Sequence, residues 1–201
     1  MKLYFVRHGE SEANLLREFS NRGFRHGLTE RGFQQAEQLG QNLDPIPFKT
    51  IYSSPLKRAV QTAEILQQHL NCPLEITDAL REFDTGILEG KSDPKSWSIH
   101  AWVFNQWFAG NWEAHIPGGE SRLDIQARFM PLIDKLRRNL SEENILLVGH
   151  GGTFQCMFPM IFTNVNDVSI REFPFHHTMP IVAEARANWL FCSQWGALKL
   201  K

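Results

Sequence analysis

The chain has 201 residues, of which 42% are hydrophobic and 21% are charged, and its 21 basic residues nearly balance 22 acidic ones. This composition is typical of a globular protein that is long enough for one α/β domain and short for two, so we expect one domain over residues 1–201. The charge balance excludes the broad basic surface of a nucleic-acid-binding protein, and we expect no nucleic-acid partner.

Short apolar runs alternate with longer amphipathic segments along the chain. This alternation is typical of strands that helices join into a mostly parallel sheet. We therefore expect a three-layer α/β/α sandwich, in which helices flank a mostly parallel central sheet. The expected strands are residues 2–6, 49–53, 74–77, 145–149, 181–186 and 189–199.

Three amphipathic helices are expected between the strands. Thr29 can cap the first, and Ser54 followed by Pro55 opens the second. The third begins near Glu120, runs to Leu140, and carries apolar residues that we expect to face the sheet. The residues that share one face are Phe33, Ala36, Gly40 and Leu43 in the first helix, Ala59, Ala63, Leu66 and Leu70 in the second, and Leu123, Ala127, Met130 and Ile133 in the third.

The cysteines Cys72, Cys156 and Cys192 are odd in number and widely spaced. This favours reduced thiols over a disulfide framework or a zinc site. The first residues lack the apolar core and cleavage site of a signal peptide, and no apolar run has the length of a membrane helix. We therefore expect a cytoplasmic protein with no membrane association.

Two histidines far apart in the chain, His8 and His150, each follow a strand-like apolar run and each precede a glycine. Ligands bind at the carboxyl ends of strands in open parallel sheets, so the two imidazoles can meet beside Arg7 if both strands lie in one sheet. Arg58 lies in the first turn of the helix that Pro55 opens. Either arginine alone would more often form a surface ion pair, but two guanidinium groups aimed at one point form a strong anion site.

His8 could be a nucleophile, a metal ligand or a satisfied core histidine. Cationic neighbours disfavour its protonation, which leaves one ring nitrogen with a free lone pair for attack on phosphorus. His150 is better suited to stabilise charge on the transferring oxygens, because Gly151 and Gly152 can present N–H donors at a helix start. No carboxylate or thiolate completes a recognisable metal site, so we expect no metal.

An acid is also needed, because an alkoxide leaves a phosphate ester slowly unless it is protonated. The glycine-bounded segment 80–90 supplies Glu82, Asp84 and Glu89. Residue chemistry alone does not rank these three carboxylates, and a solvated acidic loop is the simpler interpretation.

The segment Arg7-His-Gly-Glu-Ser-Glu-Ala-Asn14 resembles the signature of the histidine phosphatase superfamily, in its phosphoglycerate-mutase-like branch. The similarity runs from residue 2 to about residue 155, and six blocks in the family's order are far more specific than one short motif. The other blocks are residues 28–32, 53–62, 80–82 with Gly86 and 88–90, 117–121, and 149–151.

The resemblance implies that His8 is the residue that becomes phosphorylated. The residues at positions of the family's phosphate pocket are Arg7, Asn14, Arg58, His150 and Gly151. The family's chemistry needs no metal or other cofactor, since the arginines supply the positive charge.

Glu82 matches the family's proton donor, which leaves Asp84 and Glu89 as loop or capping residues. The implied reaction is hydrolysis of a small-molecule phosphate monoester, in which His8 attacks phosphorus in line and Glu82 protonates the leaving oxygen. Glu82 then activates the water that hydrolyses the phosphohistidine. The oligomeric state and the particular ester are not indicated.

Two alternatives to a phosphatase remain. Family mutases generally carry a longer insertion after the acid, which retains a bisphosphate, whereas here residues 91–116 are all that separates the acid loop from the next turn. Only Lys91 and Lys95 in that segment could meet a second phosphate. A non-catalytic phospholigand-binding member would be favoured by loss of the nucleophile or the acid, and neither is lost.

Residues 91–116 form a lid-like excursion that is rich in aromatic residues, and an aromatic lid suits an apolar or aromatic leaving group. The simpler interpretation is that these rings pack the excursion onto the domain. We expect at least one of Trp102, Phe104 and Trp107 to line the substrate entrance. The aromatic residues are Trp97, Trp102, Phe104, Trp107, Phe108 and Trp112.

His176 and His177 precede the strand expected at 181–186, where small polar residues are more usual in the family. Either histidine could reach the leaving group and tune specificity. A pair of solvated loop histidines is the simpler alternative.

Overall fold

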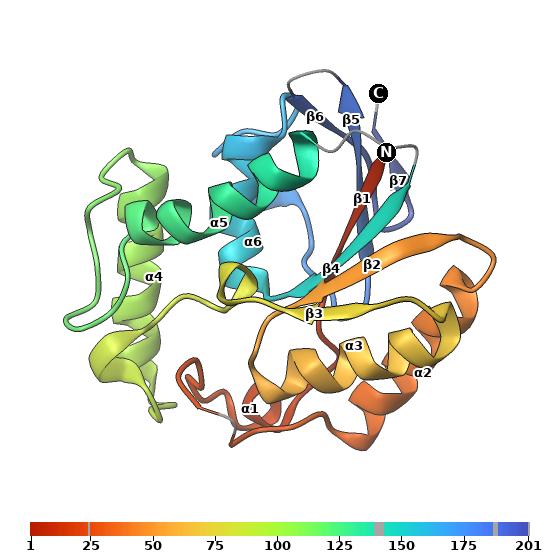
Figure 1. Ribbon diagram of the computed structural model, residues 1–201. Helices are drawn as coiled ribbons and strands as arrows, with labels where there is room; N and C mark the ends of the chain where they lie inside the picture. The colour runs from red at the N-terminus through yellow and green to blue at the C-terminus, as the bar shows by residue number, and fades with distance from the viewer. Residues whose placement is uncertain (24, 139–142, 187–188, 201) are drawn as a thin grey trace.

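The computed structural model describes residues 1–23, 25–138, 143–186 and 189–200, which form a seven-stranded sheet with helices on both faces (Figure 1). The strands are β1 (Lys2–Arg7), β2 (Phe48–Ser53), β3 (Leu74–Ile76), β4 (Asn144–Gly149), β5 (Pro180–Arg186), β6 (Trp189–Trp195) and β7 (Leu198–Lys199). The helices are α1 (Glu12–Leu16), α2 (Glu30–Leu43), α3 (Lys57–Leu70), α4 (Pro94–Phe108), α5 (Arg122–Arg138) and α6 (Gly151–Ile161). The expected α/β sandwich is confirmed.

The strand order is β3-β2-β4-β1-β5-β6-β7, and the first four of these strands are parallel. The other pairings, from β1/β5 to β6/β7, are antiparallel. The strands β3, β2, β4 and β1 therefore form the parallel sheet that the sequence predicts. The C-terminal strands β5, β6 and β7 join this sheet through antiparallel pairs. The β5 and β6 segments are too close in the chain for the long crossover that a parallel pair requires.

Side chains of successive strand residues point to opposite faces of the sheet, and each face has its own core. On β1, Leu3 and Phe5 belong to the core with α5 and α6, whereas Tyr4 and Val6 belong to the core with α2 and α3. Figure 1 shows α4 standing apart from the sheet, on the side of α5 and α6. A cavity lies between α4 and the residues at the carboxyl ends of β1 and β4.

The first two helices differ from expectation at their ends and faces. Thr29 caps α2 as expected, since its Oγ1 accepts the Gly32 N–H at 3.0 Å, but Phe33 is 37% exposed and Gly32 lies on the buried face instead. The second helix begins at Lys57 with Leu56 as its N-cap, so Ser54 does not cap it as expected.

The third helix buries a different stripe from the expected one. Leu123 and Ala127 are exposed, Met130 is half-buried, and of the expected set Ile133 alone is buried. Larger side chains take the buried face, because they remove more apolar area from water. The expected end of this helix near Leu140 lies outside the described residues. The buried apolar residues are Ile125, Phe129, Leu132, Ile133 and Leu136.

The strand expected over 189–199 is two strands, because Gly196 turns the chain with a φ of 56° between β6 and β7. Such a positive φ favours glycine. The cysteines Cys72, Cys156 and Cys192 are free and buried. In the ranges that the structure describes, no helix has both the length and the apolar character of a membrane span.

Candidate active site

His8 and His150 meet at the carboxyl ends of adjacent parallel strands. The register pairs Arg7 of β1 with Gly149 of β4, so the residues that follow these two strands are neighbours. The two ring centroids lie 5.0 Å apart, and both side chains are almost fully buried. The expectation that both strands share one sheet is confirmed, and it brings the two imidazoles together.

The hydrogen bonds of His8 identify which ring nitrogen holds the lone pair. Nδ1 lies 2.6 Å from the Gly9 carbonyl oxygen, which can only accept, so Nδ1 carries the hydrogen. Nε2 lies 3.1 Å from Nε of Arg58, which can only donate, so Nε2 is the unprotonated nitrogen. Burial, followed by the charge of Arg58, lowers the pKa of His8 well below 6.5 and keeps the imidazole neutral.

Two arginines are fixed beside His8 by backbone carbonyls. Arg58 donates from Nη1 to the Ser20 carbonyl at 2.7 Å, and Arg7 donates from Nη1 to the Phe175 carbonyl at 2.7 Å. Burial lowers the pKa of both, that of Arg58 to about 10, so both stay cationic at neutral pH. Nε of Arg7 is buried and has no hydrogen-bond partner among the described residues. Because buried donors are normally paired, this atom indicates a place for an acceptor.

His150 has a similarly unpaired atom. Its Nδ1 is buried without a partner in the described part of the chain, and its Nε2 lies 2.7 Å from Oγ of Ser54. Within the described residues the Ser54 hydroxyl has no acceptor other than Nε2, so its hydrogen is assigned to Nε2 and the histidine hydrogen to Nδ1. Ser54 is thus a site residue that the sequence analysis assigned to a helix start instead.

Asn14 lines the same cavity from α1. Its Oδ1 accepts from the backbone N–H and the hydroxyl of Ser11, at 3.0 and 2.8 Å. Its amide nitrogen makes no hydrogen bond to any described residue, so it remains a free donor at the cavity. Of the expected pocket residues, Arg7, Asn14, Arg58 and Gly151 line the cavity together with His8. His150 lies against His8 but is not part of that lining.

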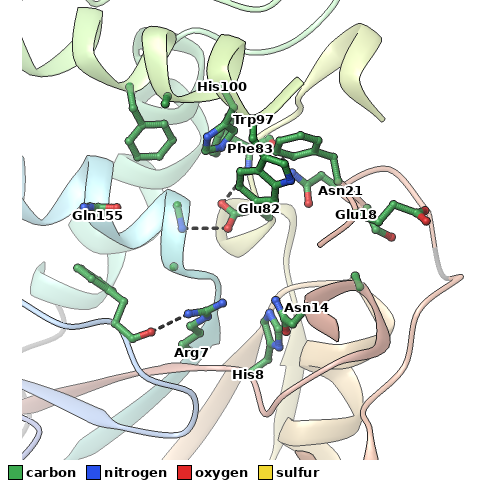
Figure 2. A pocket seen from close by; sticks show the side chains of 18 of the residues that line it. Arg7, His8, Asn14, Glu18, Asn21, Glu82, Phe83, Trp97, His100 and Gln155 are labelled. Carbon is green, nitrogen blue, oxygen red and sulfur yellow. Dashed lines mark hydrogen bonds between the residues drawn. The ribbon is translucent and has the colours of Figure 1, made fainter. Parts of the chain in front are cut away.

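Glu82 lies across the cavity at the start of α6 (Figure 2). Oε2 accepts the Gly152 N–H at 2.9 Å, while Oε1 accepts from the N–H and hydroxyl of Thr153 at 2.7 and 3.0 Å and from the Phe83 N–H at 3.1 Å. A Cβ at Gly152 would come within 2.8 Å of Oε1, so this close approach requires glycine. The backbone of α6 thereby fixes the orientation of the carboxylate.

The other two carboxylates of this loop have structural partners. Asp84 pairs with Arg22 at 2.8 Å and accepts the Gly86 N–H at 2.7 Å. Glu89 accepts the backbone N–H of Asn21 at 2.9 Å. Neither carboxylate lines the cavity, and both have the loop role that the resemblance left to them.

The cavity has a volume of about 510 Å³ and extends from Arg7, His8 and Arg58 to α4. Of the three aromatic residues expected at the entrance, Phe104 lines it. Trp102 and Trp107 do not, because Trp102 is 56% exposed on another face of α4 and Trp107 is fully buried in the core. Lys91 and Lys95 are also absent from its lining. Lining residues that the sequence analysis did not assign to the site include Trp97, His100, Phe108, Gln155 and Arg171.

The two loop histidines differ in position. His176 is exposed and outside the cavity lining. His177 lies against His8, with ring centroids 5.5 Å apart, and its Nδ1 donates to the His8 carbonyl at 2.8 Å. Burial, and then Arg7, lower the pKa of His177 to about 4. His177 therefore supports the backbone of His8, and neither histidine lines the cavity.

We expect acid to destabilise the fold because His8 and His150 are buried as neutral imidazoles. Their folded-state pKa values lie well below 6.5, mainly through burial, so the stability they carry is present above about pH 6.5 and lost as the pH falls. At about pH 5.5, protonation of the unfolded chain at these two positions should lower the free energy of unfolding by about 3 kcal/mol relative to pH 8. Urea unfolding at pH 5.5 and at pH 8 measures this change in the free energy of unfolding.

The variant His8→Gln provides the control for this prediction, because it removes one of the two buried groups. Its loss of stability between the same two pH values should be about 1.4 kcal/mol smaller than that of the wild type, because His150 and the other buried histidines of lowered pKa, His100 and His177, still contribute. An equal loss in both proteins would show that the buried imidazoles are not responsible.

Known proteins resemble this chain both in sequence and in fold. The family model of the histidine phosphatase superfamily (branch 1) matches residues 3–195. A probable phosphoglycerate mutase, GpmB, of Salmonella choleraesuis (strain SC-B67) is 32% identical over 162 residues, which cover 80% of this chain and 74% of that protein. The alpha-ribazole phosphatase from Shigella flexneri is 25% identical with a TM-score of 0.81, over 98% of this chain and 96% of that one. YhfR of Bacillus stearothermophilus is 26% identical with a TM-score of 0.82, over 98% of both chains.

Proposed function

Because this chain belongs to the histidine phosphatase superfamily, we propose that it hydrolyses small-molecule phosphate monoesters through a phosphohistidine on His8. Glu82 is the general acid and base in this proposal, and the reaction needs no metal. The whole chain, residues 1–201, would act as a single domain, with the aromatic excursion at 91–116 beside the site.

One observation carries the proposal: the lone pair of His8 lies among donors that lack acceptors. Nε of Arg7 and Nδ1 of His150 are buried and unpaired within the described residues, and the amide nitrogen of Asn14 is free. An unpaired buried donor costs about 1–3 kcal/mol, and a phosphoryl group bound at His8 would bring acceptor oxygens beside Arg7 and Asn14, which line the cavity. Arg58 adds a buried positive charge at the same place.

In the first step, Nε2 of His8 forms a bond to phosphorus as the bond from phosphorus to the ester oxygen breaks. Glu82 gives its proton to the departing alkoxide, so an alcohol leaves. Oε2 is the oxygen suited to carry that proton, because it accepts one hydrogen bond whereas Oε1 accepts three. The hydrogen bond from Nδ1 to the Gly9 carbonyl holds the ring in line and stabilises the charge it gains.

In the second step, the Glu82 carboxylate takes a proton from water as the water oxygen attacks phosphorus. The bond from phosphorus to Nε2 breaks, its electron pair returns to His8, and inorganic phosphate leaves. Glu82 is then protonated again for the next cycle. Arg7 and Arg58 neutralise the phosphoryl oxygens in both steps, as the positive groups of other phosphoryl-transfer sites do.

A mutase is the second candidate, since the curated relatives that share 32% identity with this chain carry that name. A mutase must hold a second phosphate while the first is transferred. The lysines of the excursion, Lys91 and Lys95, do not line the cavity, and the one cation that lines it beyond the phosphate site in the described ranges is Arg171. This favours hydrolysis over retention of a bisphosphate.

Release of inorganic phosphate tests the proposal directly. We expect multiple turnovers of simple phosphate monoesters in the presence of a metal chelator and without any bisphosphate activator. A mutase would instead need the activator and would return the phosphoryl group to a sugar-acid acceptor. Activity that required the activator, or that a chelator abolished, would contradict the proposed hydrolysis.

A further inference from the structure

The cavity is much larger than a phosphate group needs, and its outer half is walled by α4. A volume of about 510 Å³ is in the range of sites that enclose a whole small-molecule ligand. The half-buried residues Trp97, His100, Phe104 and Phe108 recur at helical spacing on α4 and all line the cavity. This stripe faces the space where the alcohol half of a substrate would lie.

The rings of Trp97, Phe104 and Phe108 pack partly against the core, so they help to attach α4 to the domain. Val103 and Trp107 are the apolar residues of α4 that are almost fully buried in that core. The packing interpretation therefore applies in full to the buried face of α4 and in part to its cavity face. The half-buried rings on the cavity face are partly open to solvent, and apolar surface exposed in a cleft favours ligand binding.

The rings form a wall of stacked and tilted aromatic side chains with His100 at its centre. His100 lies at 28° to Phe104, with centroids 4.9 Å apart, and at 30° to Phe83, with centroids 5.4 Å apart. Phe19 lies at 32° to the same imidazole. Figure 2 shows His100, Phe83 and Trp97 next to Glu82, across the cavity from His8 and Arg7. The wall therefore lies on the side to which the protonated leaving group departs.

His100 makes this wall aromatic and uncharged while adding a polar edge. Burial lowers its pKa to about 4, so its imidazole is neutral near pH 7. Its ring nitrogens have no hydrogen-bond partner in the described part of the protein, although it contacts four aromatic rings. A neutral imidazole can stack on a flat ring and exchange one hydrogen bond with a substituent on it.

We propose that this wall binds a flat aromatic ring in the alcohol half of the substrate, so that the preferred substrates are phosphate monoesters of aromatic or arylalkyl alcohols. The inference rests on the proposed function for one point, the position of the phosphate at His8. Among the described residues that line the outer cavity, Arg171 is the one cation, and it lies over the ring of Phe108 at 4.8 Å. The outer cavity thus suits an uncharged leaving group better than one that carries a second phosphate.

Binding of phosphonates tests the wall without requiring turnover. Benzylphosphonate and 2-phenylethylphosphonate carry a flat ring at two distances from phosphorus, and their cyclohexyl analogues have a similar size without aromaticity. We expect the better aromatic ligand to bind about 2- to 10-fold more tightly than its cyclohexyl analogue, by titration calorimetry. Equal affinities of the aromatic and cyclohexyl ligands would overturn the inference.

Variants of α4 assign the effect to the wall. His100→Leu and Phe104→Leu should each reduce the aromatic preference and leave the affinity for orthophosphate unchanged, which also shows that the variants fold. Trp102→Leu is the matched control on the same helix, since Trp102 lies outside the cavity lining, and it should keep the full preference. A preference that survives in both cavity variants would also overturn the inference.

The two proposals can fail separately. A protein that prefers aromatic phosphonates but neither hydrolyses benzyl phosphate nor forms phosphohistidine would contradict the proposed function and leave the wall's role standing. A protein that hydrolyses benzyl and cyclohexylmethyl phosphates with the same kcat/KM, through phosphohistidine, would overturn the aromatic preference alone.

Discussion

Replacing His8 with alanine is expected to lower kcat for phosphate monoesters by about 10⁴- to 10⁶-fold, the range seen when a covalent nucleophile is removed from other hydrolases. The reason is the difference between the ring nitrogens of His8 and those of His150. Nε2 of His8 is unprotonated and lies beside Arg58, whereas Nε2 of His150 is engaged by Ser54 and its Nδ1 carries a hydrogen. His150 therefore offers no lone pair to replace the missing nucleophile.

Trapping with a radiolabelled ester distinguishes loss of the nucleophile from loss of the fold. The wild type should retain label that is labile to acid and stable to base, in the peptide that contains His8, and His8→Ala should retain none. His115→Ala, which removes an exposed histidine outside the cavity, should behave as the wild type. Label on the alanine variant, or a kcat within tenfold of the wild type, would contradict the assignment of His8.

The position of the two histidines could be predicted because strands obey simple rules. Apolar runs ending at His8 and His150 predict buried strands, and parallel strands place their carboxyl ends at one edge of the sheet. The family signature then ranked Glu82 above Asp84 and Glu89, which residue chemistry alone had left equal. Family membership is confirmed by the match over residues 3–195.

Side-chain direction on the helices could not be predicted in the same way. On α4, aromatic residues occur on several faces, so the sequence does not indicate that Phe104 lines the cavity while Trp107 enters the core. The helix α5 carries two stripes of apolar residues, and the stripe with the larger side chains is the one that is buried. Which face of a helix is buried depends on the residues that lie opposite it in the folded protein.

The sequence also did not predict which side chains form the hydrogen bonds that orient the site residues. Ser54 contributes to the site through one hydroxyl group that orients His150, and a serine before a proline is equally typical of a helix start. Thr153 orients Glu82 from the first turn of α6, where an apolar run gives no sign of a polar role. These contacts arise from the meeting of segments that are distant in the chain.

Arg58→Lys is expected to lower kcat/KM by about 10³-fold or more, because arginines that neutralise a transferring phosphoryl group contribute about 10³ to 10⁵ in rate. Arg58 uses all three of its nitrogens: Nε donates to His8 at 3.1 Å, Nη1 to the Ser20 carbonyl at 2.7 Å, and Nη2 to Asn21 at 3.4 Å. A lysine has one nitrogen and cannot keep this arrangement.

The geometry also predicts which kinetic constants change. Because Nε of Arg58 contacts the nucleophilic Nε2, its loss should lower kcat as well as raise KM, and the affinity for orthophosphate should fall in the same variant. The conservative control is Arg31→Lys, at an exposed arginine outside the cavity, which should leave both constants within about twofold, since surface ion pairs contribute little. If Arg58→Lys also stayed within tenfold of the wild type, a single positive charge would suffice at this position, and the fixed fork of donors would have no part in the transfer.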